Sequence, residues 1–247
     1  MRYSNFIIYI RSKLDIKTMK NLKKIAAGLA IAVVSVGSIS AQKKVGTFGG
    51  LTQKNLGFKK IRLPYTDVVS YKGFVKPGNE DEVKDGKKFY YLYLWIPAVS
   101  PELGIRMVSP VGKNKPKNAI VSADFEANKK SKDYFDTYIT LERSDIFTKG
   151  SITESKVKNA NWHTLAKNDD SSEMPKLPSG SRYNSLLRYK SEIGNPLKAI
   201  TTGLYRIGFT TYKKGEVKGT FLAQIAAPIK LPGVVVAKSI AELKKQM

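Results

Sequence analysis

The 247-residue sequence contains no cysteine and a single histidine, His163. The absence of cysteine excludes disulfides, thiol nucleophiles and acylation of a cysteine side chain. One histidine without cysteine cannot build the usual closed zinc site, and no partner motif for serine hydrolysis accompanies it. The sequence also lacks a glycine-rich phosphate loop and a G-x-S-x-G motif. Because these absences remove the common catalytic centres, we predict that the protein is not an enzyme.

Acidic residues are also scarce, since 20 Asp and Glu stand against 43 Lys and Arg, which gives a formal charge of +23. Such an excess of positive charge suits polyanionic partners, including acidic glycans, lipopolysaccharide phosphates and nucleic acid. A solvated basic surface without a specific ligand explains the same composition. Charge alone therefore leaves the partner open.

No apolar run reaches the roughly 20 residues that a membrane-spanning helix needs. The most apolar segment, Ile25–Ile39, follows three lysines and ends at small residues before Gln42. This order is typical of a secretory signal peptide, and we predict cleavage after Ala41. Removing residues 1–41, which hold seven basic residues and one acidic residue, leaves a formal charge of +17. We accordingly divide the chain into an over-called N-terminal extension (1–18), a signal peptide (19–41) and a mature domain (42–247).

The mature domain carries the patterns of β-strands. Lys88–Val99, which reads KFYYLYLWIPAV, places aromatic or branched side chains on both faces of an extended strand. Both faces must then be covered, which predicts a central strand. The string YFDTYITLER, residues 134–143, alternates apolar and polar side chains as a half-buried strand does.

Turn signals separate these strands. Asp85-Gly86 predicts a tight turn, and residues 203–228 read as one long hairpin turning at Lys214-Gly215. Ser144–Arg182 reads as a long loop with helical character in part of Ser151–Lys167, and a short helix is expected at residues 239–247. The pattern predicts one all-β domain, a β-sandwich or barrel, with only a few short helices.

Two adjacent carboxylates, Asp169 and Asp170, stand in the string KNDDSSE. Neighbouring negative charges raise each other's pKa unless a cation, hydrogen bonds or solvent relieve them. Ca²⁺ takes six to eight oxygen ligands and needs neither histidine nor thiol, and Asp136 with Thr137 would add further oxygens. The acidic run 80–82 has an equal claim on spacing, and a solvated loop is the competing interpretation of both.

Several long strings carry a family resemblance. They are LPYTDVVSYKGFVKPG, KKFYYLYLWIPAVSPELGIRMVSPVG, YFDTYITLER, RYNSLLR and GLYRIGFTTYKKGEVKGTFLA. In this order and at matching separations, they resemble the major surface lipoprotein family of leptospires, surface lipoproteins of the Spirochaetales order. The resemblance runs through nearly all of Gly46–Lys245. It implies a single-domain jelly-roll β-sandwich with a few short peripheral helices, similar to calcium-dependent collagen-binding modules.

The resemblance also implies a calcium site. The family holds the ion through an aspartate and a threonine in a Phe-Asp-Thr string, two aspartates of an acidic loop, and the tyrosine of a Tyr-Asn-Ser-Leu string. These positions are occupied here by Asp136, Thr137, Asp169, Asp170 and Tyr183. Tyr183 would contribute its backbone carbonyl, because a neutral phenol is a poor calcium ligand beside carboxylates. The acidic loop is reduced here to two aspartates, and the acidic run 80–82 has no counterpart and is expected to be a solvated turn.

We therefore expect a secreted, non-enzymatic, calcium-binding β-sandwich protein with a structural or adhesive role at the outer membrane, at the cell surface or in the periplasm. Extracellular matrix proteins or anionic glycans are the expected partners, together with the outer membrane. That association would lack a lipid anchor, because Ala41-Gln42 replaces the family's lipidated cysteine. Nucleic acid is not expected, since an exported protein meets little of it. The alternative function is a carboxylate-dependent glycan hydrolase.

Overall fold

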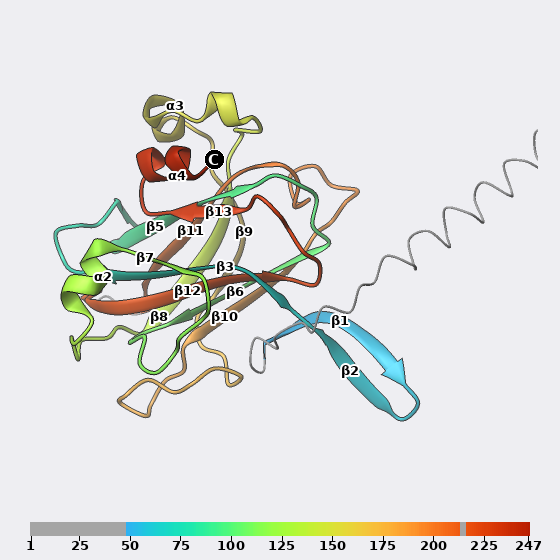
Figure 1. Ribbon diagram of the computed structural model, residues 1–247, viewed down its shortest axis with the longest axis horizontal. Coiled ribbons are helices and arrows are strands. Elements are labelled where there is room, and N and C mark those ends of the chain that lie inside the picture. The colour runs from blue at the N-terminus through green and yellow to red at the C-terminus, as the bar shows by residue number, and fades with distance from the viewer. Residues whose placement is uncertain (1–47, 213–215) are drawn as a thin grey trace, which may run out of the picture. The chain divides into compact units, whose positions relative to one another are not determined.

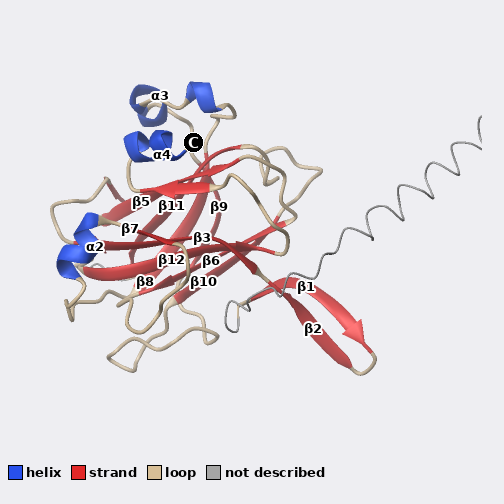
Figure 2. Cartoon of the chain, in the orientation of Figure 1, coloured by secondary structure: helices blue, strands red, loops and turns tan. Residues whose placement is uncertain are grey.

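The computed structural model describes residues 48–212 and 216–247, which belong to one compact unit (Figures 1 and 2). The predicted signal peptide and its cleavage site lie outside the described residues. The described elements in chain order are β1 (Gly49–Leu56), β2 (Lys59–Pro64), β3 (Thr66–Val75), β4 (Glu82–Lys84), β5 (Lys87–Ile96), β6 (Glu102–Val108), β7 (Ala119–Val121), α2 (Ala123–Asn128), β8 (Thr137–Arg143), η1 (Lys149–Ser151), α3 (Glu154–Lys158), β9 (His163–Asn168), β10 (Ser185–Lys190), β11 (Gly203–Thr211), β12 (Gly219–Ala227), β13 (Val235–Ala237) and α4 (Ile240–Gln246).

Two large sheets form a sandwich. One has the strand order β10-β6-β12-β3-β7, and the other has the order β13-β5-β11-β8-β9, with β4 paired to β5. The long strands alternate between the sheets along the chain: β3, β6, β10 and β12 lie in one, and β5, β8 and β11 in the other. This alternation is how a jelly roll connects its two sheets. The predicted all-β sandwich is therefore confirmed.

Strand β5 is central, as its sequence predicts. It pairs with β11 on one side and with β13 and β4 on the other. Tyr90, Leu92 and Leu94 are buried in the core between the sheets. Trp95 points to the opposite face, where it packs with residues of α3 and α4, including Leu243. The two short helices thus cover the outer face that the aromatic pattern requires to be covered (Figure 1).

Two predictions about connections are wrong, and two are confirmed. Strands β11 and β12 do not pair as a hairpin, because β11 pairs with β5 and β8 whereas β12 pairs with β3 and β6 in the other sheet. The predicted turn at Lys214-Gly215 lies outside the described residues. The segment Ser144–Arg182 is not one loop, since it contains η1, α3 and β9. The turn at Asp85-Gly86 is present, with φ angles of 52° and 73°, and α4 forms at the predicted C-terminal helix.

Among the described residues, no helix is long and apolar enough to cross a membrane.

A glycine in β6 permits one of the closest contacts in the fold. A Cβ atom on Gly104 would lie 2.1 Å from Cε2 of Tyr65 and 2.8 Å from Cζ of Phe48. Both aromatic rings are buried, so neither can move aside freely. A Cβ atom on Gly150, in η1, would meet nothing within 4 Å.

We predict that Gly104→Ala lowers the free energy of unfolding by about 1–3 kcal/mol, because the added methyl group overpacks the Tyr65 and Phe48 rings. The matched variant Gly150→Ala should change it by less than about 0.5 kcal/mol. Urea titration followed by fluorescence measures both. Equal effects of the two substitutions would contradict the close packing at Gly104.

Candidate metal centre

Three segments that are distant in sequence meet at one edge of the sandwich. Asp136 directly precedes β8, the pair Asp169-Asp170 directly follows β9, and Tyr183 lies just before β10. Since β8 and β9 are antiparallel and Ile139 is paired with Asn168, the start of β8 lies beside the end of β9. The amide of Leu186 in β10 donates to Oδ1 of Asn168 at 3.2 Å. The structure therefore gathers all the predicted ligand segments.

The three aspartates form a tight carboxylate cluster. One carboxylate oxygen from each of Asp136, Asp169 and Asp170 lies within 4.8 Å of the other two. All three residues are half-buried, and this is the only such group of potential metal ligands in the described part of the chain. Like charges at this separation repel one another strongly unless a cation lies among them.

Asp169 is the most perturbed member of the carboxylate cluster. Burial, and then the negative charges of Asp170 and Asp136, raise its pKa to about 6 from the ordinary value of 3.8. Its Oδ1 atom is buried and accepts no hydrogen bond from any described residue. A buried carboxylate oxygen without a donor is rare, because leaving it unsatisfied costs about 1–3 kcal/mol or more. A cation at this point would satisfy it.

One basic side chain already lies near the carboxylate cluster. The Nε atom of Arg182 is 3.8 Å from Oδ2 of Asp136, and its Nη1 atom is 3.6 Å from Oδ2 of Asp170. Both distances exceed those of a hydrogen-bonded ion pair, and the Arg182 side chain is 36% exposed. Arg182 therefore offsets part of the negative charge of the cluster without contacting Asp169.

Thr137 and Tyr183 are placed differently beside the carboxylate cluster. Thr137 is fully buried, and its hydroxyl donates to Oγ of Ser185 at 2.9 Å while accepting the Ser185 amide at 2.8 Å. The Ser185 hydroxyl in turn donates to the Thr137 carbonyl. The Tyr183 amide donates to Oδ1 of Asp170 at 3.1 Å, whereas its ring packs against Lys176. The backbone of Tyr183, and not its phenol, therefore borders the cluster.

Two residues near the carboxylate cluster were not predicted from the sequence. Arg182 and Ser185 stand in the RYNSLLR string, one and two residues from the predicted ligand Tyr183. Nothing in that string shows that Arg182 reaches the aspartates or that Ser185 bonds to Thr137. The Ser185–Thr137 contact joins the first residues of β10 and β8, which are 48 residues apart, and Arg182 reaches Asp136 from the segment just before β10.

The competing acidic run 80–82 is arranged differently. Glu80 forms an ion pair with Lys88 at 3.1 Å, Asp81 with Lys238 at 2.5 Å, and Glu82 with Arg206 at 3.4 Å. Each of these carboxylates lies beside a different basic side chain, although Arg206 also pairs with Glu142 at 2.5 Å. The run is therefore not a shared carboxylate cluster, unlike that of Asp136, Asp169 and Asp170.

The raised pKa of Asp169 makes a prediction for the metal-free protein. Because the folded state holds this proton more tightly than the unfolded chain does, ionisation of Asp169 destabilises the fold, and the loss develops as the pH rises from 3.8 to about 6. In EDTA at pH 7.5, Asp169→Asn should therefore have a higher Tm than the wild type. The difference should shrink toward zero as the pH is lowered to 4.

Thermal unfolding followed by circular dichroism over this pH range tests the prediction. Asp124→Asn, at an exposed position on α2, is the matched control and should show no comparable pH-dependent gain. A wild-type Tm equal to or above that of Asp169→Asn at pH 7.5 would show that the carboxylates do not repel one another in the metal-free protein.

The fold and the carboxylate cluster together define a jelly-roll β-sandwich protein with a candidate cation site. The family model described as the surface lipoprotein of Spirochaetales order matches residues 59–236, a span that includes the whole cluster. The chain therefore belongs to this family, as the resemblance predicts, and its membership indicates a place at the cell surface or in the envelope. A search of the curated proteins finds no match.

Proposed function

We propose that this protein is a non-enzymatic, calcium-binding β-sandwich protein of the cell envelope. The observation that carries the proposal is the meeting of Asp136, Asp169 and Asp170 within 4.8 Å, around a buried Asp169 oxygen that has no donor among the described residues. An arrangement of this kind is unfavourable without a cation and favourable with one.

Calcium fits this set of ligands better than other common metals do. Ca²⁺ accepts six to eight oxygens in flexible geometry, drawn from carboxylates, backbone carbonyls and water. Zinc and most transition metals select nitrogen or sulfur ligands, and the chain has no cysteine and its lone histidine is not in the cluster. The three carboxylates with Arg182 nearby leave a net charge of about −2, which a divalent cation balances.

The other two predicted ligands would contribute backbone oxygens. The backbone of Tyr183 borders the carboxylate cluster, which supports its carbonyl as a ligand. The carbonyl of Thr137 already accepts the Ser185 hydroxyl, but a carbonyl oxygen has two lone pairs and could also bind an ion. The Thr137 hydroxyl is occupied by Ser185, so we propose that Thr137 contributes its carbonyl.

The proposed ion would join the two sheets of the sandwich. Asp136 and the pair Asp169-Asp170 flank β8 and β9 of one sheet, whereas Tyr183 leads into β10 of the other. Calcium at this edge would therefore stabilise the packing of β8 and β9 against β10. We infer a structural role for the ion, with partners bound elsewhere on the surface.

The proposed partners are extracellular matrix proteins or anionic glycans. The positive charge of the mature chain supports anionic ligands, since clustered Lys and Arg attract polyanions at long range. The surface location of the family supports a binding or adhesive role over an intracellular one.

We predict that calcium stabilises the protein through this carboxylate cluster. Free calcium at about 100 times the Kd should add roughly 2.7 kcal/mol to the free energy of unfolding, which raises the Tm by several degrees. Asp136→Asn and Asp169→Asn should abolish most of this gain, because each removes a ligand charge. Glu80→Gln, in the acidic run with its own basic partner, is the matched control and should keep the full gain.

The experiment is thermal unfolding of the purified protein in EDTA and in a millimolar calcium titration. Absence of a calcium-dependent rise in Tm for the wild type, or an equal rise in all variants, would remove the proposed site. Turnover of any member of a glycan panel would favour the alternative, a carboxylate-dependent hydrolase. A hydrolase should lose turnover on carboxylate substitution while its fold stays intact.

A further inference from the structure

The β1–β2 hairpin stands apart from both large sheets. It forms a two-stranded sheet of its own and projects from the sandwich (Figure 1). Its strands are antiparallel, with Lys54 paired to Ile61 and Leu56 paired to Lys59, so the chain reverses at Gly57-Phe58. Gly57 has a φ of 60°, as the first central position of a type II′ turn requires. The tip is therefore a defined turn that presents Phe58.

The tip combines one aromatic side chain with several basic ones. Phe58 is fully exposed, with a relative accessibility of 109%. Lys54, Lys59 and Lys60 are also exposed. The sixteen residues from Gly49 to Pro64 contain four basic residues and no acidic residue. A tip with an exposed ring and flanking lysines has the composition of segments that dock at membrane interfaces.

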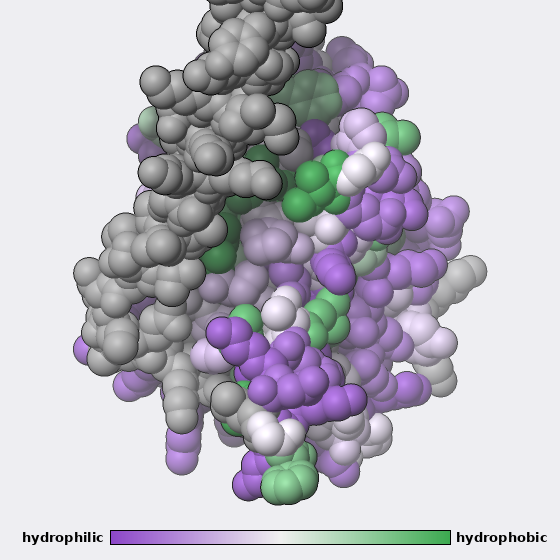
Figure 3. Space-filling model, turned by 90° about the vertical axis from the view of Figure 1, so that its right-hand side faces the viewer, coloured by the Kyte–Doolittle hydropathy of each residue, from purple (hydrophilic) through white to green (hydrophobic). Residues whose placement is uncertain are grey.

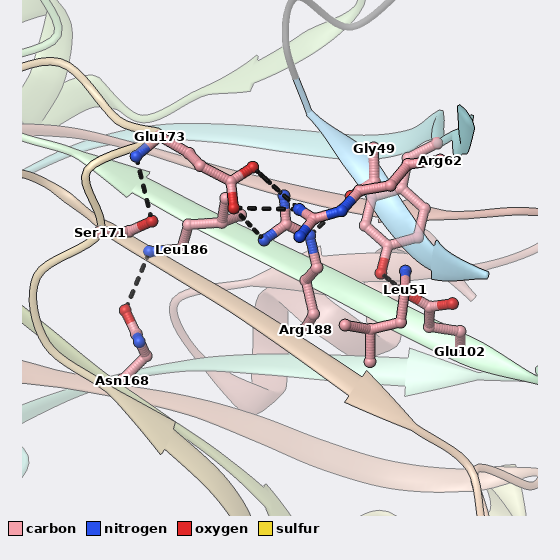
Figure 4. A network of polar contacts seen from close by, with 10 residues as sticks. Gly49, Leu51, Arg62, Glu102, Asn168, Ser171, Glu173, Leu186 and Arg188 are labelled. Carbon is pink, nitrogen blue, oxygen red and sulfur yellow. Dashed lines mark hydrogen bonds and ion pairs between the residues drawn. The ribbon is translucent and has the colours of Figure 1, made fainter. Parts of the chain in front are cut away.

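The base of the hairpin is fixed by charged side chains, of which Glu102 is buried and Glu173 is partly exposed (Figure 4). The Nε atom of Arg188 in β10 donates to the Gly49 carbonyl at 2.6 Å. Glu173 accepts from Arg188 at 2.9 and 2.6 Å and from Arg62 of β2 at 3.0 and 3.2 Å. Glu102, which is only 1% exposed, accepts the amide of Leu51. The hairpin is thus held at its base, and only its tip is left without such contacts to the sandwich.

We propose that this hairpin docks the protein on an anionic phospholipid bilayer. Phe58 would enter the interface between headgroups and acyl chains, and Lys54, Lys59 and Lys60 would contact lipid phosphates. The inference rests on the proposed envelope location and adds how a chain without cysteine is held at a membrane. One ring and a few lysines give weak, reversible attachment, because stable anchoring needs stronger or multiple signals.

Charge favours a bilayer over a second copy of this chain as the occupant. A symmetric contact between two tips would bring two sets of lysines together, with no acidic residue in either hairpin to relieve them. Where described residues are visible on the face that Figure 3 shows, hydrophobic residues lie in small groups among hydrophilic ones. Phe58, with the less exposed Leu51 and Ile61 on the same hairpin, offers much less area than the roughly 800 Å² per partner of a specific protein interface.

Co-sedimentation with vesicles of phosphatidylglycerol and phosphatidylethanolamine, in EDTA, tests the proposal. Phe58→Ser should weaken binding by about tenfold, from lost apolar burial. The double variant Lys59→Gln/Lys60→Gln should weaken it by about 25-fold, at roughly fivefold for each lysine. The matched controls are Ile193→Ser, an exposed apolar residue elsewhere, and Lys113→Gln/Lys115→Gln, an exposed lysine pair elsewhere. Both controls should stay within about twofold of the wild type, since neither touches the hairpin.

A second readout places the ring in the membrane. In Phe58→Trp, tryptophan emission should shift to the blue on vesicle addition and be quenched by brominated lipid, above the background of Trp95 and Trp162. Equal losses in hairpin variants and controls would show general electrostatic adsorption, and would overturn the proposal. The proposal would also be overturned if Phe58→Ser bound vesicles as the wild type does. The same holds if sedimentation equilibrium showed a wild-type dimer that Phe58→Ser loses. Because EDTA removes calcium from this experiment, its outcome is independent of the calcium titration.

Discussion

The burial of both faces of the sheet that contains β5, β11 and β8 is the constraint on which the rest of the structure depends. Its inner face packs against the second sheet through residues such as Leu92 and Phe209, which are fully buried. Its outer face is covered by α3 and α4, which pack on Trp95 and Leu204. A sheet buried on both sides has one register only, because a slip of one residue would exchange its two faces. That fixed register sets where β8 begins and β9 ends.

The carboxylate cluster follows from this register. The rigid sandwich holds Asp136 beside the Asp169-Asp170 pair although their charges repel. Hydrogen bonds from Thr137 to β10 and from β10 to Asn168 hold the two sheets together at this edge. Three carboxylates that share a small volume suit a cation, since the cost of bringing them together is met when the chain folds. Under the proposed function, a calcium ion would join the two sheets at this edge, so calcium binding would stabilise the fold there.

Most of the architecture can be predicted from the sequence, because the strongest patterns coincide with the most buried strands. The aromatic string of β5 predicts a central strand, and the positive-φ turn at Asp85-Gly86 can be recognised from residue type. The assignment of β11 and β12 to different sheets cannot be predicted in this way, because two adjacent apolar strands with a turn between them also fit a hairpin. The ligand segments follow from a family resemblance and not from spacing. The places of Arg182 and Ser185 depend on pairing between distant strands, which no local pattern encodes.

The account depends most on a cation among the three aspartates, and a crystal structure of the protein grown with millimolar calcium tests this most directly. The account predicts one ion with oxygen ligands from Asp136, Asp169 and Asp170 at about 2.3–2.6 Å, together with the Tyr183 carbonyl. It also predicts that the ion contacts the Asp169 oxygen that has no donor in the described structure. A well-ordered site at the same calcium concentration that holds only water, with Arg182 beside the aspartates, would contradict it.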